Sequence, residues 1–249
     1  MAENASSGRV DITGPFFDLY NRLTGYTFKA DLQEAFSMTV QNEEARPRRA
    51  SHVDEELAIR FVNTVAWRRA DEQEERLPSA EALLRWFADA RLFDAGFLRA
   101  LSLEWKGDPV LAENGYQTAL SLRETIYRTL QSAASDKAPA KTDLSLLSQL
   151  LNAGTPGMQL SVQRGRYLWN ADRHANGVFV LLMPVLISAL ALLTGPHSHK
   201  VKQCQDDRGC GWLFVDESRA QNRRWCSMGD CGNRAKARRH YVRQRDADV

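Results

Sequence analysis

The chain has 249 residues, of which 43% are hydrophobic and 26% are charged. These ordinary proportions exclude a collagen-like, coiled-coil or wholly disordered chain. The length allows one main domain with a small module attached to it. The net charge of +2 is unevenly spread, because the last 50 residues carry 12 Lys and Arg against 7 Asp and Glu, whereas the first 199 carry 21 against 24. The basic charge is therefore concentrated near the C-terminus.

Residues 1–50 are interpreted as an N-terminal extension. Phe17, Tyr20 and Leu23 have roughly helical spacing, and a polar, basic stretch follows them. Two alternatives stay open for this extension, namely disorder or a loosely docked helix. The first residues contain no basic region followed by an apolar run, so we expect no secretory signal.

A helical body is predicted over residues 51–196. Ser51–Asp54 resembles a capping box, and Leu57, Phe61 and Arg68 then share one helical face. Further helices are predicted where a turn or capping residue precedes an apolar pattern of helical period: from Pro78-Ser79, from Asp94, over Asn114–Ala134 and from Asp143.

The period changes from 3.6 to 2 near residue 158. Met158, Leu160 and Val162 alternate with polar residues, and a Gly-containing turn leads to Tyr167–Trp169, which predicts a β-hairpin. The apolar run Val178–Leu193 follows, and because a membrane span needs about 20 residues, we interpret it as a buried core helix. The sequence thus predicts a mainly α body with one hairpin, in a protein without a membrane anchor.

All four cysteines lie in the last fifth of the chain, in the pattern C-x5-C-x15-C-x4-C: Cys204, Cys210, Cys226 and Cys231. Two pairs of thiols separated by a loop are typical of a structural zinc site with four closed ligands. The pattern favours zinc over two disulfides, which need an oxidising compartment, and over an iron–sulfur cluster. We therefore expect a cytoplasmic protein. Three nearby histidines compete as ligands: His197, His199 and His240.

The segment 197–249 is predicted to be a small zinc-stabilised module that ends in a basic helix. It contains few large apolar residues, so metal binding must supply much of its folding free energy, on the order of 10 kcal/mol in small fingers. The stretch Asn233–Arg245 has no Gly or Pro and is rich in Ala, Arg and Lys, which favours a helix.

Several motifs in this module resemble the CGNR zinc-finger family: Cys210–Asp216, Ser218-Arg219, Arg223–Met228 and Cys231–Arg234 followed by Lys236. The body is similar to the ABATE domain that is usually paired with this finger, and Arg60–Val65 resembles its opening motif. The family is described as transcription regulators linked to stress responses. The resemblance implies zinc and suggests DNA as a partner.

Basic residues flank the last two cysteines and suit contacts with nucleic-acid phosphates and base edges. The candidates are Arg219, Arg223, Arg224, Asn233, Arg234, Lys236, Arg238, Arg239 and Arg243. Asn233 could equally stabilise a turn, and Trp212 and Trp225 are interpreted as packing residues around the metal. A solvated basic helix, an RNA partner and a protein partner remain as alternatives to DNA.

No catalytic motif of the common hydrolase, kinase, nucleotide-binding or metalloprotease kinds is present, so we expect no enzyme. In the body, Asn63 and Thr64 form a polar pair within an apolar pattern. They could cap a neighbouring backbone or line a pocket for a small-molecule effector. The first hypothesis is a DNA-binding transcription regulator, and the second is a zinc-dependent protein-interaction module. The oligomeric state is not indicated.

Overall fold

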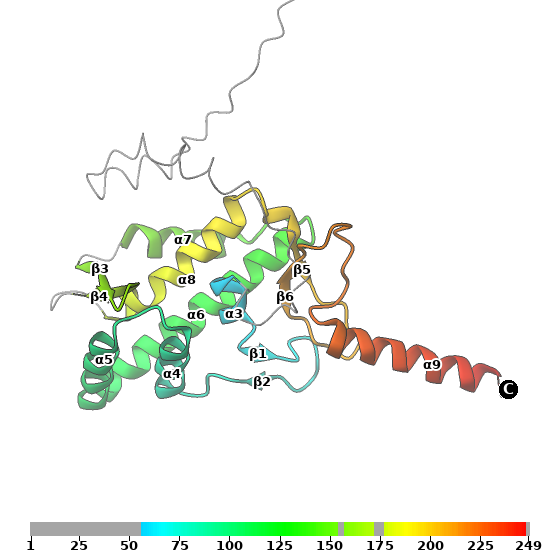
Figure 1. Cartoon of the computed structure of the whole chain (residues 1–249), viewed down its shortest axis with the longest axis horizontal. Coiled ribbons are helices and arrows are strands. Elements are labelled where there is room, and N and C mark those ends of the chain that lie inside the picture. Colours follow the sequence, from blue (N-terminus) through cyan, green and yellow to red (C-terminus); the bar gives the residue numbers. More distant parts are fainter. Residues whose placement is uncertain (1–55, 154–156, 172–176, 248–249) are drawn as a thin grey trace, which may run out of the picture. The chain divides into compact units, whose positions relative to one another are not determined.

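The computed structural model describes residues 56–153, 157–171 and 177–247. The described part of the chain is mainly helical, as predicted, and it is organised around the long helix α6 (Pro109–Ala134). Helices α3 (Leu57–Val62), α4 (Ala80–Ala90), α5 (Ala95–Gly107), α7 (Lys141–Ala153) and α8 (Gly177–Thr194) all pack against α6 or against each other (Figure 1). The predictions for residues 1–50 and for the capping box at 51–54 lie outside the described residues.

Side-chain caps start three helices of the body. Ser79 caps α4 by accepting a hydrogen bond from the Ala82 N–H, and Asp94 caps α5 in the same way, as predicted. Asp108 caps α6, with Pro109 in the first turn, where its missing N–H costs no hydrogen bond. The predicted start at Asn114 was therefore five residues too late.

The first described helix is shorter than its apolar pattern indicates. Helix α3 ends at Val62, and the chain then forms β1 (Val65–Ala66), which pairs with β2 (Glu74–Glu75) in a short antiparallel ladder. Val65 is buried, as helical periodicity predicts, but in a strand. The prediction of a helix through Arg68 was wrong because buried residues at this spacing also fit a bend and a strand.

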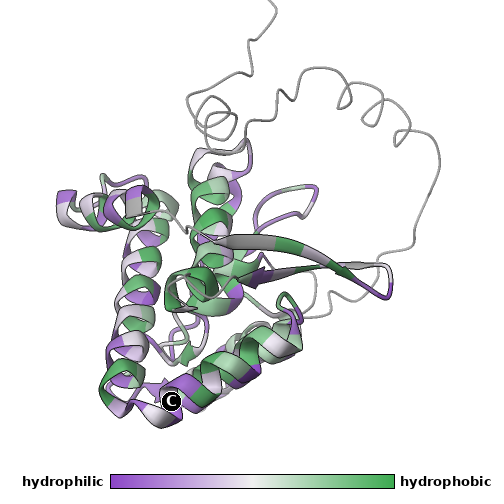
Figure 2. Cartoon of the chain, turned by 90° about the vertical axis from the view of Figure 1, so that its left-hand side faces the viewer, coloured by the Kyte–Doolittle hydropathy of each residue, from purple (hydrophilic) through white to green (hydrophobic). Residues whose placement is uncertain are grey.

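The predicted hairpin is formed by β3 (Met158–Gln163) and β4 (Arg166–Ala171), which pair in antiparallel register across the turn Arg164-Gly165. The hairpin stands out from the helices (Figure 2). The backbone of β4 is tied to the start of α5, because the N–H of Trp169 donates to the carbonyl of Leu92 at 2.8 Å.

Helix α8 is the only described helix that is long and apolar enough to cross a membrane. Its inward-facing side chains are buried against α3 and α6, with Val180, Leu181 and Val185 fully enclosed. Burying a side chain of this size contributes about 1.5–3 kcal/mol, so α8 serves as a core helix of the body, as its length predicts.

The C-terminal region begins after α8. It consists of the 3₁₀ turn η2 (Ser198–Lys200), the short strands β5 (Val201–Gln203) and β6 (Leu213–Val215), the π-helical turn η3 (Met228–Gly232) and α9 (Asn233–Ala247). Val201 and Leu213 belong to the same hydrophobic core as the body helices. The ladders β1–β2 and β5–β6 were not predicted, because strands of two or three residues leave no periodic pattern.

Candidate metal centre and nucleic-acid interface

The four cysteines converge from distant points of the C-terminal region. Cys204 follows β5, Cys210 lies in the turn before β6, Cys226 ends the long loop after β6, and Cys231 lies in η3. Their sulfur atoms all lie within 4.8 Å of one another. The three competing histidines are not part of this cluster, which in the described residues contains cysteine alone.

The donor set fits a tetrahedral metal ion. Zinc binds thiolates at about 2.3 Å, which places sulfurs at neighbouring corners of the tetrahedron about 3.8 Å apart. The Sγ atoms of Cys210 and Cys226 are 3.8 Å apart, and those of Cys226 and Cys231 are 3.7 Å apart. Four protein sulfurs leave no open coordination position, so the geometry suits a structural metal site.

The electrostatics of the cluster also favour a cation. Hydrogen bonds from the thiols of Cys210 and Cys226 lower the pKa of Cys204 to about 2. Burial and the negative charge of neighbouring thiolates raise the pKa of Cys231 above its usual range. The Cys204 thiol thus ionises easily, whereas the Cys231 thiol does so only at high pH, because thiolates this close repel one another. A divalent cation at the centre would offset this repulsion.

Arg234 ties the start of α9 to the cysteine cluster. Its guanidinium donates to the Cys231 sulfur at 2.7 Å and to the buried carboxylate of Asp206 at 2.9 Å. The guanidinium carbon also lies 5.2 Å from the ring centre of Trp67, in the body. Arg234, predicted to contact nucleic acid, is thus occupied by intramolecular contacts. Hydrogen bonds of this kind orient metal ligands and adjust their charge.

A second buried acid, Asp216, organises the long loop between β6 and Cys226. Its carboxylate accepts hydrogen bonds from Lys202 at 2.6 Å, from the Ser218 hydroxyl at 2.6 Å and from the Arg223 N–H at 2.9 Å. Burial alone raises the pKa of a carboxyl group, but these three donors and the Ser218 N–H outweigh it and lower the pKa of Asp216.

Arg223 is likewise used inside the module. Its guanidinium donates to the carbonyl of Cys226 at 2.7 Å and lies over the ring of Phe214 at 4.7 Å. The side chain is half-buried. Arg223 therefore holds the backbone that carries a cysteine.

The metal centre is joined to the body by backbone hydrogen bonds. The N–H groups of Arg68 and Arg69 donate to the carbonyls of Cys210 and Gly209 at 3.1 and 2.9 Å. Gly209 has a φ of +95°, and a Cβ atom there would lie 2.6 Å from the nitrogen of Ala70. Only glycine allows the cysteine-bearing turn to approach the body this closely.

Asn63 and Trp212 complete this junction. The side-chain amide of Asn63, at the end of α3, bonds both the N–H and the carbonyl of Leu213 in β6. The indole N–H of Trp212 donates to the carbonyl of Val65 at 2.8 Å, so Trp212 packs as predicted. Asn63 thus caps a neighbouring backbone, which was one of the two alternatives for this residue.

Thr64 belongs to a partly buried ionic network of the body. Its hydroxyl donates to the carbonyl of Phe61 and accepts from Arg123, whose guanidinium forms a bidentate pair with Glu75. A second carboxylate, that of Glu124, joins Arg123 to Arg68. The network therefore connects α6 to the segment that contacts the cysteine-bearing turn.

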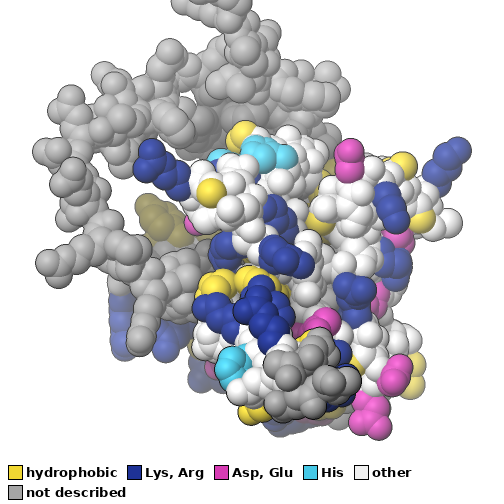
Figure 3. Space-filling model, turned by 90° about the vertical axis from the view of Figure 1, so that its right-hand side faces the viewer, with side chains coloured by type: hydrophobic (Ala, Val, Ile, Leu, Met, Phe, Trp, Pro, Cys, Tyr) yellow, Lys and Arg dark blue, Asp and Glu magenta, His cyan; other side chains and the backbone are white. Residues whose placement is uncertain are grey.

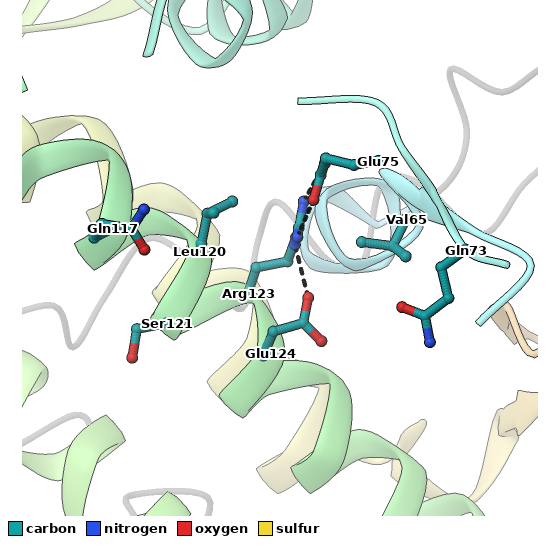
Figure 4. Close-up of a pocket in the computed structure, with 8 residues that line it drawn as sticks. All are labelled: Val65, Gln73, Glu75, Gln117, Leu120, Ser121, Arg123 and Glu124. Atoms are coloured by element: carbon teal, nitrogen blue, oxygen red, sulfur yellow. Dashed lines mark hydrogen bonds and ion pairs between the residues drawn. The ribbon is translucent and has the colours of Figure 1, made fainter. Parts of the chain in front are cut away.

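A pocket of about 510 Å³ lies beside this network (Figure 4). It is lined by Val65, Gln73, Glu75, Gln117, Leu120, Ser121, Arg123 and Glu124. Asn63 and Thr64 are not among the lining residues, so this pocket does not test the predicted effector contact at these two positions, which stays a prediction. The charged groups of the pocket bind one another, as the dashed lines from Arg123 show.

Helix α9 carries two basic faces. Lys236, Arg239 and Arg243 are three or four residues apart and share one face, which we call the outer stripe. Arg234 and Arg238 lie on the opposite face, where they pair with Asp206 and Asp207. In the described structure Lys236 and Arg243 form no ion pair, and both are exposed.

The remaining predicted contacts lie around this helix. Arg219 is exposed in the loop after β6, and Arg224 is exposed and bonds Gln205. The guanidinium groups of Arg224 and Arg239 lie 5.5 and 6.0 Å from the ring of Trp225, which brings this side of the loop next to the outer stripe. Lys and Arg side chains gather on this end of the molecule (Figure 3).

Asn233 stabilises a turn, which was the second interpretation given to it. Its side-chain amide donates to the carbonyl of Gly229 at 2.9 Å, one turn earlier. The sequence reasoning missed four residues that build the site: Asp206, Asp216, Trp67 and Arg68. For Asp206 and Asp216, the signal available in the sequence was their position as acids within a basic segment. Nothing in the sequence pattern indicated that Trp67 and Arg68 contact the site.

Comparison with known families agrees with this architecture. Residues 55–196 match the ABATE family, described as "Putative stress-induced transcription regulator", and residues 200–244 match the CGNR zinc finger. No curated protein matches the chain. The ABATE match covers more than half of the sequence and adjoins a four-cysteine cluster in the CGNR segment. The chain therefore belongs to the ABATE family and carries a C-terminal CGNR zinc finger.

Proposed function

We propose that this protein is a DNA-binding transcription regulator whose finger holds one structural Zn²⁺ through Cys204, Cys210, Cys226 and Cys231. The proposal rests chiefly on one observation: the outer stripe of α9 stays exposed, while Arg234 and Arg238 on the opposite face pair with Asp206 and Asp207. An α-helix with its side chains is about 10–12 Å across and fits a major groove about 12 Å wide, and the 15 residues of α9 give about 22 Å of length to lie along it.

The zinc ion would act as a structural staple in this account. It would fix η3, and with it the first turn of α9, against the turn that contacts Arg68 and Arg69 of the body. The stripe residues Lys236 and Arg243 would contact phosphates, together with nearby Arg219 and Arg224. We further propose a cytoplasmic setting, which keeps thiols reduced, and a role without catalysis.

The test is a salt titration of binding to random duplex DNA. Zinc-loaded protein is compared with the Cys226→Ser/Cys231→Ser variant, and zinc content is measured in both. The four proposed phosphate contacts predict that the logarithm of affinity falls against the logarithm of salt with a slope of about −3.6. The variant is expected to lose zinc and this binding together.

Two other outcomes separate the alternatives. Zinc-loaded, folded protein without affinity for duplex DNA at low salt would contradict the proposal and favour a protein-interaction module. Tighter binding to duplex or hairpin RNA than to DNA of matched sequence would also contradict it, and would assign the stripe to RNA.

A further inference from the structure

The two outer edges of the hairpin differ in their main-chain hydrogen bonds. The edge of β4 is bonded to the segment before α5, whereas β3 has no described strand beside its outer edge. On the outer edge of β4, the N–H of Trp169 donates to Leu92 at 2.8 Å, and its carbonyl accepts from Asp94 at 2.9 Å. In the described part of the chain, β3 pairs with β4 alone. The outer edge of β3 is therefore the side on which further main-chain pairing is available.

The turn of the hairpin determines which groups point outward along β3. Arg164 and Gly165 have φ angles of +49° and +74°, as in a type I′ turn, so Gln163 and Arg166 form the first hydrogen-bonded pair. Hydrogen-bonded and non-hydrogen-bonded pairs alternate along an antiparallel ladder. The backbone N–H and carbonyl groups of Leu160 and Val162 therefore point away from β4.

These two residues are also apolar and exposed. Leu160 and Val162 are 58% and 61% exposed, and Tyr167, which lies directly opposite Val162 on the same face, is 73% exposed. Edge strands are normally protected by charged residues, proline or a bulge. The sequence of β3, Met-Gln-Leu-Ser-Val-Gln, contains neither a charge nor a proline.

We propose that β3 pairs with β3 of a second copy of this chain and forms a continuous four-stranded antiparallel sheet. A two-fold axis at Leu160 places this residue opposite its own symmetry mate and Val162 opposite position 158 of the second copy. All of these positions point their backbone groups outward, so about six main-chain hydrogen bonds can form. The same register joins the apolar faces of the two hairpins.

The charges of the hairpin permit this pairing. The charged residues nearest β3, Arg164 and Arg166, lie at or beside the turn, and antiparallel pairing puts the two turns at opposite ends of the sheet. No like charges of β3 therefore face one another across the axis. A strand without charge is self-complementary, which favours an identical strand over a charged peptide.

The exposed apolar area predicts how tight the dimer is. Leu160, Val162 and Tyr167 offer on the order of 400 Å² per copy, about half of what a standard stable interface buries on each side. We therefore expect a reversible dimer with a dissociation constant in the micromolar range. This inference does not depend on the proposed nucleic-acid role.

Sedimentation equilibrium of the full zinc-loaded chain, from about 1 to 200 µM, tests the proposal. The wild type is expected to shift from monomer to dimer across this range. Leu160→Lys and Leu160→Glu each place like charges at the two-fold axis and are expected to remain monomeric. An equimolar mixture of the two variants is expected to dimerise again, because opposite charges then face each other.

Leu103→Lys is the matched control, since Leu103 is 69% exposed on α5 and lies off the hairpin. This variant is expected to dimerise like the wild type, and far-ultraviolet circular dichroism checks that every variant is folded. A wild type that stays monomeric over the whole range would overturn the proposal. A dimer that survives Leu160→Lys, or variants that fail to recombine on mixing, would overturn the pairing as well.

Discussion

The side-chain amide of Asn63 and the backbone of Leu213 form two hydrogen bonds, of 2.8 and 3.1 Å, across 150 residues of sequence. The side-chain amide of Asn63 thus forms with Leu213 the pair of hydrogen bonds that the backbone of a neighbouring strand would otherwise form. It satisfies the buried N–H and the buried carbonyl of Leu213 together. Finger and body share a core at Leu213, so the finger is an integral part of the fold.

This pair predicts the effect of an isosteric change. Asn63→Asp removes the donor that reaches the Leu213 carbonyl and places two acceptors against each other. We expect the free energy of unfolding in urea to fall by about 2–3 kcal/mol. Asn114→Asp makes the same chemical change at an exposed position of α6 and is expected to change stability by less than about 0.5 kcal/mol. Equal effects of the two variants would contradict the account.

Replacing Gly209 or Gly165 by alanine is expected to lower stability by different amounts, although both glycines have a positive φ. A Cβ atom at Gly209 meets the backbone of Ala70 at 2.6 Å, whereas one at Gly165 meets nothing within 4 Å. We expect Gly165→Ala to cost about 1 kcal/mol, from backbone strain alone. Gly209→Ala is expected to cost clearly more and to expose the cysteine-bearing turn, measured as faster hydrogen exchange at Arg68 and Arg69. Indistinguishable stabilities would refute this docking role of Gly209.

Arg234 predicts a link between the first turn of α9 and metal retention. Arg234→Gln removes the hydrogen bond to the Cys231 sulfur and leaves the carboxylate of Asp206 unpaired. Zinc transfer to a chromogenic chelator is expected to reveal a loss of affinity of about 10- to 100-fold. Arg238→Gln is the control, because Arg238 pairs only with the exposed Asp207. If both variants retain zinc equally, Arg234 does not support the site.

Asp216 predicts a dependence of stability on pH. Its pKa is lowered in the folded protein, so its contribution is complete above the pKa of an unfolded aspartate, about 3.9, and is lost as pH falls through the lower folded value. Asp216→Asn removes the partner of Lys202. Its destabilisation relative to the wild type is expected to be largest near neutral pH and to shrink toward pH 2, measured by urea unfolding on metal-free protein. A constant difference would contradict this role.

The sequence predicted the helices best where a capping residue precedes a long apolar pattern, as at Ser79 and Asp94. It failed after Val62, because a buried bend and a short strand repeat the same apolar spacing as a helix. The cysteine cluster was predictable because four similar ligands lie within 28 residues of sequence. The partners of Asn63 and Arg234 were not predictable, because tertiary packing decides that these side chains meet Leu213 and Asp206.

The basic residues illustrate the same limit. Spacing alone places Arg234, Arg238 and Lys236 on one helix, but it does not indicate which of them form ion pairs with acidic residues of the same chain. The structure separates them, because Asp206 and Asp207 both lie on one side of α9. The candidates for nucleic-acid contacts are thereby reduced to the outer stripe and the neighbouring loop.

The most direct test compares two double variants with the same change of charge on opposite faces of α9. Lys236→Glu/Arg243→Glu alters the outer stripe. Arg238→Glu/Arg245→Glu alters the opposite face, where Arg238 pairs with Asp207 and Arg245 lies two turns further along the helix. With zinc content and helicity unchanged, the account predicts that the first variant loses at least about tenfold in affinity for duplex DNA at about 100 mM salt. The second is expected to stay within about threefold of the wild type. Equal losses in both variants, or no loss in the first, would contradict the assignment of the outer stripe.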